Sequence, residues 1–318
     1  PSTKMIMHTT KAISKIADEL NASVQAAPHW TGDYSSANAL YTGRQFRLPG
    51  NPALNQLHDT AQQKLHIQES WVDDFTPVNI LSKYPVIVDA DSKIMTSESV
   101  RAILEYVKGG GILLAPLSMG KYMPGSAKPV YQIAAGFGAG DIQASKQQTG
   151  SVVFDKCNVF MRNLYYIKGS SGKMKPLAAD SKGKTLLWQA DYGKGKIIFS
   201  AGIIDYAKSS DFLESFLEKY AGKPPVNISA KVPVQAGTVE NKDAYFVVIR
   251  PVMPRNNVNA SIEQMNALKK VPVTISGKVS INNNTVRECI WDTSIKFSGN
   301  AIKFDAVPGT LYVVRIKK

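Results

Sequence analysis

The side chain best placed for chemistry is Ser118, which follows the apolar run 112–115 in the turn Pro116-Leu-Ser-Met-Gly120. A hydroxyl displayed on a tight turn after a buried strand can act as a nucleophile when a neighbouring base removes its proton. No Gly-x-Ser-x-Gly pattern surrounds Ser118, and no histidine follows His66, so a base would have to come from an upstream loop. A turn residue whose hydroxyl satisfies backbone groups is the competing interpretation.

Acidic side chains supply two further groups to weigh. Asp89 and Asp91 stand at the carboxyl end of the apolar run 85–89, and ligands bind at that edge of open parallel α/β sheets. Turn and helix-capping roles compete for both residues. Asp73 and Asp74 resemble the paired acids of a glycosidase, but consecutive residues on an extended strand face opposite sides of it. Because Asp89 ends the apolar run and stands at the carboxyl end of the predicted strand, it is the acidic candidate for a catalytic role.

Aromatic side chains gather in the segment 26–52, where Pro, Gly and Ser interrupt any periodic pattern and predict a long loop. A loop of this length in a compact domain is more often functional or partner-bound than idle. Aromatic faces can stack on sugar rings, so Trp30, Tyr34 and Tyr41 are the candidate ligand-binding residues. Packing of these rings against a neighbouring domain is the competing interpretation.

The elements that must position these groups show most clearly between residues 85 and 115. Two short apolar runs, 85–89 and 112–115, are typical of buried parallel strands. Between them, the capping signature Thr96-Ser-Glu98 opens a helix over 97–108, and three glycines end it. The order strand, helix, strand predicts a βαβ unit. Other predicted elements are helices at 9–21, 53–64 and 210–220, a strand at 66–71, and a hairpin pairing 185–189 with 196–200.

Two glycine-rich stretches, Gly109-Gly-Gly111 and Gly193-Lys-Gly195, could suggest phosphate cradles. The first precedes a strand rather than a helix, and the second links two strands, so neither matches a nucleotide-binding fingerprint. Both are predicted to be turns.

The sequence changes character after Lys223-Pro-Pro225, where we expect a domain boundary. Short β-rich runs separated by Asn- and Gly-rich turns then predict an all-β sandwich. These runs are 245–249, 271–275, 278–281, 301–304 and 310–316.

Composition narrows the classes of partner. The formal charge is +13, but the lysines are scattered singly and form no basic stripe interleaved with aromatics, so no nucleic-acid partner is expected. The two cysteines are far apart in the sequence, and none of the four histidines stands at a spacing typical of metal ligands. We therefore expect no metal site, and no motif implies a cofactor. No apolar run could cross a bilayer and no signal peptide is recognisable, so no membrane contact is expected, and the compartment stays open between cytoplasm and the periplasm or exterior.

Several of these stretches resemble the C-terminal part of glycoside hydrolase family 42 beta-galactosidases. The resemblance to the middle domain of that family lies in Leu81-Ser-Lys-Tyr84, Val86-Ile-Val-Asp89, Met95-Thr-Ser-Glu98 and the segment 103–112. The segment 192–199 resembles the family's glycine-lysine-glycine hairpin, and the segment 306–315 is similar to the strands that close its β-sandwich.

The resemblance covers residues 52–222 well and 223–318 loosely. It implies a flavodoxin-like domain of the class I glutamine amidotransferase type over 1–222, with an N-terminal helix and long loop at 1–51, followed by a β-sandwich over 223–318. It also implies a homo-oligomer, often a trimer in that family, and a carbohydrate substrate for the parent enzyme. The family's catalytic glutamates lie on a barrel that is absent from this chain, so no glutamate here inherits their roles.

Three functions follow as hypotheses. The leading one is a non-catalytic accessory and oligomerisation region of a carbohydrate-active enzyme. The second is a carbohydrate-binding module that uses the aromatic loop or a face of the sandwich. The third is a stand-alone hydrolase with an amidotransferase-like fold, centred on Ser118 or Asp89.

Overall fold

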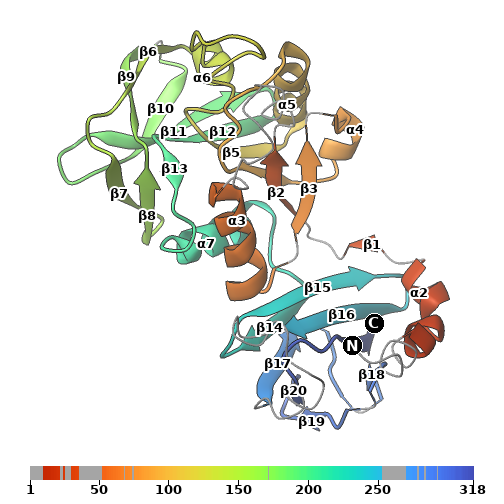
Figure 1. Ribbon diagram of the computed structural model, residues 1–318. Helices are drawn as coiled ribbons and strands as arrows, with labels where there is room; N and C mark the ends of the chain where they lie inside the picture. The colour runs from red at the N-terminus through yellow and green to blue at the C-terminus, as the bar shows by residue number, and fades with distance from the viewer. Residues whose placement is uncertain are drawn as a thin grey trace. The chain divides into compact units, whose positions relative to one another are not determined.

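The computed structural model describes residues 10–21, 24–25, 30–35, 52–67, 69–73, 75–170, 172–252, 270–277, 279–282, 284–291 and 293–318. The chain divides into two compact units (Figure 1). The α/β unit comprises 30–60 and 69–222, and the sandwich unit comprises 1–29, 61–68 and 223–318.

A seven-stranded sheet forms the centre of the α/β unit. Its strand order is β10 (Met174–Ala179), β11 (Thr185–Tyr192), β12 (Gly195–Ser200), β5 (Ile112–Pro116), β4 (Val86–Asp89), β2 (Trp30–Ser35) and β3 (Glu69–Asp73). The strands from β12 to β3 run parallel, whereas β11 is antiparallel to both of its neighbours. The predicted hairpin of residues 185–200 is therefore confirmed as β11 and β12.

Helices of the α/β unit connect or flank these strands. They are α3 (Pro52–Asp59), α4 (Val78–Leu81), α5 (Ser97–Gly109), α6 (Gln132–Gly136) and α7 (Ser210–Tyr220), and a π-helical segment (Thr60–Lys64) follows α3 in the chain. Within the unit, α5 packs against β12, α3 against β2, and α7 against β8 (Cys157–Arg162).

The predicted strand-helix-strand unit is confirmed as β4, α5 and β5, with the two strands paired in parallel. Every residue of β4 is buried, as its apolar sequence requires. The hydroxyl of Thr96 accepts a hydrogen bond from the Ser99 backbone N–H at 3.1 Å, which caps α5. The helix buries Val100, Ile103 and Val107 on one face.

The two glycine-rich turns pack against each other, which explains why Gly193 and Gly195 must be glycine. A Cβ on Gly195 would lie 2.2 Å from the carbonyl oxygens of Gly111 and Val107. Gly193 has φ +60°, and a Cβ there would lie 2.4 Å from the carbonyl oxygen of Lys108. Both stretches are turns, as predicted, and their role is to bring the end of α5 close to the β11–β12 hairpin.

Two small antiparallel sheets complete the α/β unit. In one, β6 (Ala139–Ala144) pairs with β9 (Tyr165–Ser170), and in the other β8 lies between β7 (Thr149–Phe154) and β13 (Ile203–Ile204). Asp155 and Lys156 join β7 to β8 with φ of +47° and +68°, as in a type I′ hairpin. None of these pairings is predicted from the sequence, because strands such as β6, with four exposed residues in six, carry little alternation.

Residues 30–35 correct one prediction, because they form strand β2 instead of part of a loop. The strand lies between β4 and β3, which supply its hydrogen bonds on both sides. Its sequence, Trp-Thr-Gly-Asp-Tyr-Ser, contains no apolar run, so its strand character depends on partners that are distant in sequence.

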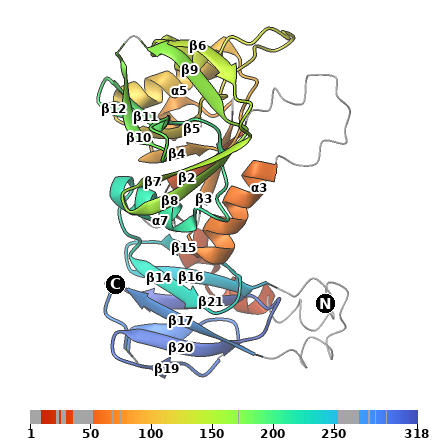
Figure 2. The ribbon, with the colours of Figure 1, turned by 90° about the vertical axis from the view of Figure 1, so that its left-hand side faces the viewer.

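The sandwich unit contains two antiparallel sheets (Figure 2). One has the order β1 (Val24–Gln25), β15 (Val234–Glu240), β16 (Ala244–Pro251), β21 (Tyr312–Lys317) and β18 (Val286–Glu288). The other has the order β14 (Val226–Ala230), β17 (Val271–Gly277), β20 (Ala301–Ala306) and β19 (Lys296–Phe297). Val247 and Val314 of the first sheet share a buried core with Ile275 and Ile302 of the second, in agreement with the predicted sandwich.

One predicted strand of the sandwich is wrong. In the run 278–281, the described residues 279–281 are not a strand, and the Ile281 backbone N–H instead donates to Asn300 Oδ1 at 2.8 Å.

The N-terminal helical region packs on the first sheet of the sandwich unit. Residues 10–14 are helical, a turn at residues 15–16 interrupts them, and α2 (Ala17–Asn21) follows. Ala12 and Ile16 are buried with Phe246 and Val313 of the first sheet. The predicted domain over 1–222 therefore differs from the compact units, because helical periodicity reveals an apolar face but not which sheet that face covers.

Candidate functional site

The candidate site lies at the carboxyl edge of the parallel sheet. Strands β4, β5 and β12 are adjacent and parallel, so the residues after Asp89, Pro116 and Ser200 meet at one edge. The Leu117 backbone N–H donates to the carbonyl of Ser200 at 2.8 Å, which ties two of these strand ends together.

Ser118 is fully buried in this edge, with no exposed surface. Its Oγ lies 3.3 Å from Asp91 Oδ1 and donates to it, and its carbonyl accepts from the Lys121 backbone N–H at 3.0 Å. The hydroxyl thus faces a carboxylate, while the sequence holds no histidine between residues 67 and 318. The structure brings Ser118 and Asp91 together, but it does not expose the hydroxyl to a substrate.

Asp91 is the ion-paired acid of this edge. Its side chain is 12% exposed, and Lys93 Nζ lies 2.8 Å from its Oδ2. Burial raises the pKa of the Asp91 carboxyl, while Lys93, the Ser118 hydroxyl and Lys121 act against that rise without cancelling it.

Asp89 performs a turn role in the structure. Its side chain is buried, and both carboxylate oxygens accept from the Ser92 backbone N–H, at 3.2 and 3.1 Å. This is the geometry by which an aspartate stabilises the chain reversal after a strand. The carboxylate faces its own loop, so Asp89 does not act as a base that takes the proton of the Ser118 hydroxyl.

A lysine surrounded by aromatic rings borders the edge and is not predicted from the sequence. Lys121 Nζ lies 5.0, 5.7 and 5.1 Å from the ring centroids of Tyr122, Tyr131 and Tyr165. Burial alone would lower the pKa of Lys121, but the hydrogen bonds and charges of the tyrosines outweigh burial and raise it. Lys121 is therefore a fixed cation, stabilised by cation–π contacts, and not a general base.

The remaining predicted residues include one that the sheet brings to this edge, because Tyr34 near the carboxyl end of β2 pairs with Asp89 at the end of β4. Trp30 and Tyr34 lie on β2, and Tyr41 lies outside the described residues. Asp73 closes a local turn by accepting from the Phe75 backbone N–H and the Thr76 hydroxyl, both at 3.0 Å.

Within the described residues, no group of three or more His, Cys, Asp and Glu side chains could hold a metal ion. Across the same parts of the chain, none of the helices combines the length and apolar character that a membrane crossing requires.

Comparisons with known proteins identify the fold. No family model and no curated protein sequence matches the chain. Against the beta-galactosidase from Bacillus circulans sp. alkalophilus, the TM-score is 0.62 at 15% identity, covering 96% of this chain and 44% of that one. Against a catalytic mutant of a GH42 beta-galactosidase from G. stearothermophilus, the TM-score is 0.59 at 12% identity, covering 91% and 41%.

A glycoside hydrolase of another specificity has a similar fold. Against alpha-L-fucosidase isoenzyme 2 from Paenibacillus thiaminolyticus, the TM-score is 0.54 at 12% identity, covering 96% of this chain and 50% of that one. The chain thus spans half or less of the length of these enzymes. It shares their mixed α/β and β-sandwich fold.

Proposed function

We propose that this chain is a non-catalytic accessory and oligomerisation region of a carbohydrate-active enzyme related to the family 42 beta-galactosidases. The likeness to less than half of each beta-galactosidase, over more than nine-tenths of this chain, supports a region of a larger enzyme. The observation that carries the proposal is the state of Ser118, which is fully buried with its hydroxyl bonded to Asp91.

A serine nucleophile needs a base that takes its proton and an opening that admits the substrate. At this edge the partner of the hydroxyl is an ion-paired carboxylate, and the hydroxyl has no exposed surface. These features argue against a stand-alone hydrolase centred on Ser118. Asp89, whose carboxylate is bonded to the backbone of its own turn, offers no better centre.

In this proposal the α/β unit is a flavodoxin-like domain of the class I glutamine amidotransferase type. It provides contacts between subunits in a homo-oligomer, for which a trimer is one candidate form. The sandwich unit stiffens the assembly. The parent enzyme acts on a carbohydrate, and this chain requires no cofactor.

The test of this proposal is an assay of the purified chain on aryl beta-galactosides. We expect no hydrolysis above that of buffer. Turnover that disappears in Ser118→Ala or Asp89→Asn would overturn the non-catalytic assignment. The oligomeric part is tested separately by solution mass, because a trimer has three times the 34.7 kDa of one chain and a monomer at all concentrations would overturn that part alone.

A further inference from the structure

A polar pocket of about 350 Å³ opens on the outer face of the small sheet β7-β8-β13, apart from Ser118 and Asp91. This volume lies within the range of small-molecule sites. The whole lining belongs to the α/β unit, and it includes residues of β7 and β8, the β10–β11 turn and the segment that follows β13.

Strand alternation explains the chemistry of the pocket wall. Along β8, Val159 and Met161 are buried, so Phe160 and Arg162 share the opposite, outer face. Their antiparallel partners on β7 are Ser151 and Thr149, whose side chains therefore lie on the same face. One wall thus combines an aromatic ring that is 36% exposed, two hydroxyls and a guanidinium.

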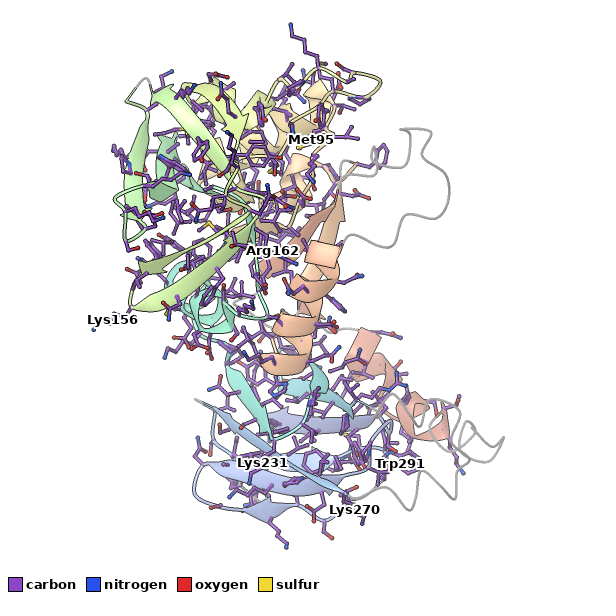
Figure 3. All side chains as sticks on the ribbon, turned by 60° about the vertical axis from the view of Figure 1, so that its left-hand side comes forward. Met95, Lys156, Arg162, Lys231, Lys270 and Trp291 are labelled. Atoms are coloured by element: carbon purple, nitrogen blue, oxygen red, sulfur yellow. The ribbon has the colours of Figure 1, made fainter. Side chains whose placement is uncertain are left out.

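The guanidinium of Arg162 is held in place by two partners. Its Nη2 donates to Gln56 Oε1 at 3.3 Å, and its Nε lies 3.9 Å from Asp205 Oδ2. Gln56 in turn donates from Nε2 to Asp205 Oδ1 at 2.9 Å. Because these contacts use only part of the five-donor fork, the arginine is oriented and still has N–H groups for a ligand. Figure 3 shows Arg162 at one end of β8 and Lys156 in the turn before its other end.

Two lysines make the pocket net positive. Lys182 and Lys208 line it and are exposed, and neither ammonium forms an ion pair with any residue that the structure describes. The carboxylate of Asp180 accepts from the backbone N–H groups of Lys182 and Lys184, both at 2.9 Å. The carboxylate of Asp205 is held by Arg162 and Gln56. Both acids are thus already engaged, while two cations are available.

We propose that this pocket binds a small acidic saccharide, in which a carboxylate or sulfate meets the cations and a sugar face lies on Phe160. Arginine and lysine recognise such anions by charge-assisted hydrogen bonds. The serine and threonine hydroxyls suit the hydroxyls of a sugar, and an aromatic ring suits its apolar face. The inference depends on the pocket and not on the proposed accessory role.

The test measures binding to the full chain by titration calorimetry or ligand-detected NMR. Glucuronate and galactose 6-sulfate are the acidic probes, glucose and galactose are their neutral counterparts, and sodium sulfate is a simple anion. We expect both acidic sugars to bind more tightly than their neutral counterparts and than sulfate, with an affinity that falls as salt is added.

Three variants locate the site. Lys182→Gln and Lys208→Gln, at exposed positions, should each weaken acidic-sugar binding, and Arg162→Gln should weaken it about tenfold or more. Lys156→Gln is the matched control, because it removes one exposed lysine that lies roughly 20 Å from Arg162 along β8. This variant should leave binding unchanged.

Each remaining outcome overturns the inference in a defined way. Equal binding of acidic and neutral sugars, or no binding at all, would reject an acidic-saccharide site. Sulfate binding as tight as that of galactose 6-sulfate would reduce the pocket to an anion site. Binding that survives all three variants, or that Lys156→Gln abolishes, would place the ligand elsewhere.

Discussion

Asp91 shows how a single ionisable side chain can make the stability of the α/β unit depend on pH. Its ordinary pKa is 3.8, and burial raises it in the folded protein. The native state therefore binds this proton more tightly than the unfolded state does. The stabilisation is fully present below pH 3.8 and is lost as pH rises through the folded pKa.

We expect Asp91→Asn to remove this part of the pH dependence. Measured by urea unfolding at a series of pH values above 3.8, the free energy of unfolding of the wild type should fall relative to that of Asp91→Asn as pH rises. Lys93→Met should enlarge the fall, because Lys93 lowers the pKa of Asp91. Parallel curves for the wild type and Asp91→Asn would contradict this account.

Glu288 is a buried carboxylate in the sandwich unit, where it satisfies backbone donors. Its Oε1 accepts from Ile290 N–H at 3.0 Å, and its Oε2 accepts from the N–H groups of Trp291 and Thr293 at 2.6 and 3.3 Å. Glu288→Ala leaves these donors without the carboxylate, so it should lower the free energy of unfolding by about 3 kcal/mol. Glu288→Gln retains one oxygen and should cost less, as measured by chemical denaturation. Equal losses would contradict this account, because glutamine keeps both the size of the glutamate side chain and one acceptor oxygen.

At the scale of elements, the contact between the two glycine turns fixes the end of α5 to the β11–β12 hairpin. Because a Cβ on Gly195 would meet backbone oxygens at 2.2 Å, relief requires the main chain to move. We expect Gly195→Ala to lower the free energy of unfolding by ~1–3 kcal/mol. The control is Gly109→Ala, where nothing lies within 4 Å and a helical position should gain roughly 0.5–1 kcal/mol. Thermal unfolding followed by circular dichroism measures both, and a neutral Gly195→Ala would contradict the packing argument.

Elements with local signals are predictable from the sequence, and those that depend on distant partners are not. The unit β4-α5-β5 is read correctly because its apolar runs, the Thr96 cap and the glycine stop lie within about 30 residues. Strand β2 is missed because its polar sequence becomes a strand only between β3 and β4.

The candidate sites show the same limit. The sequence points to Ser118 and Asp89 after two buried strands, but the structure joins Ser118 to Asp91 instead, at 3.3 Å. Lys121 and Tyr165 are 44 positions apart, and Gln56 and Arg162 are 106 apart. No spacing rule relates such pairs, because sheet pairing and helix packing, rather than local periodicity, bring them together.

At the scale of the whole molecule, each unit has a buried core of its own, and this predicts two separable unfolding transitions. Ile87 of β4 belongs to the α/β unit and Ile275 of β17 belongs to the sandwich unit, and both are fully buried. Replacing either by alanine should cost its own unit about 2–5 kcal/mol. The other unit should keep its transition midpoint.

Tryptophan fluorescence can report on the two units separately. Of the four tryptophans, only Trp291 falls in the sandwich unit, where its Nε1 donates to the carbonyl of Leu311 at 2.8 Å. In Trp291→Phe the emission reports on the α/β unit alone, so urea unfolding of this variant should be shifted by Ile87→Ala and left in place by Ile275→Ala. In the protein that retains Trp291, the emission reports on both units. Ile275→Ala should then shift only the contribution of Trp291 to the unfolding curve, which is the contribution that is missing in Trp291→Phe. A single transition that both alanine variants move by the same amount would show that the two cores unfold as one.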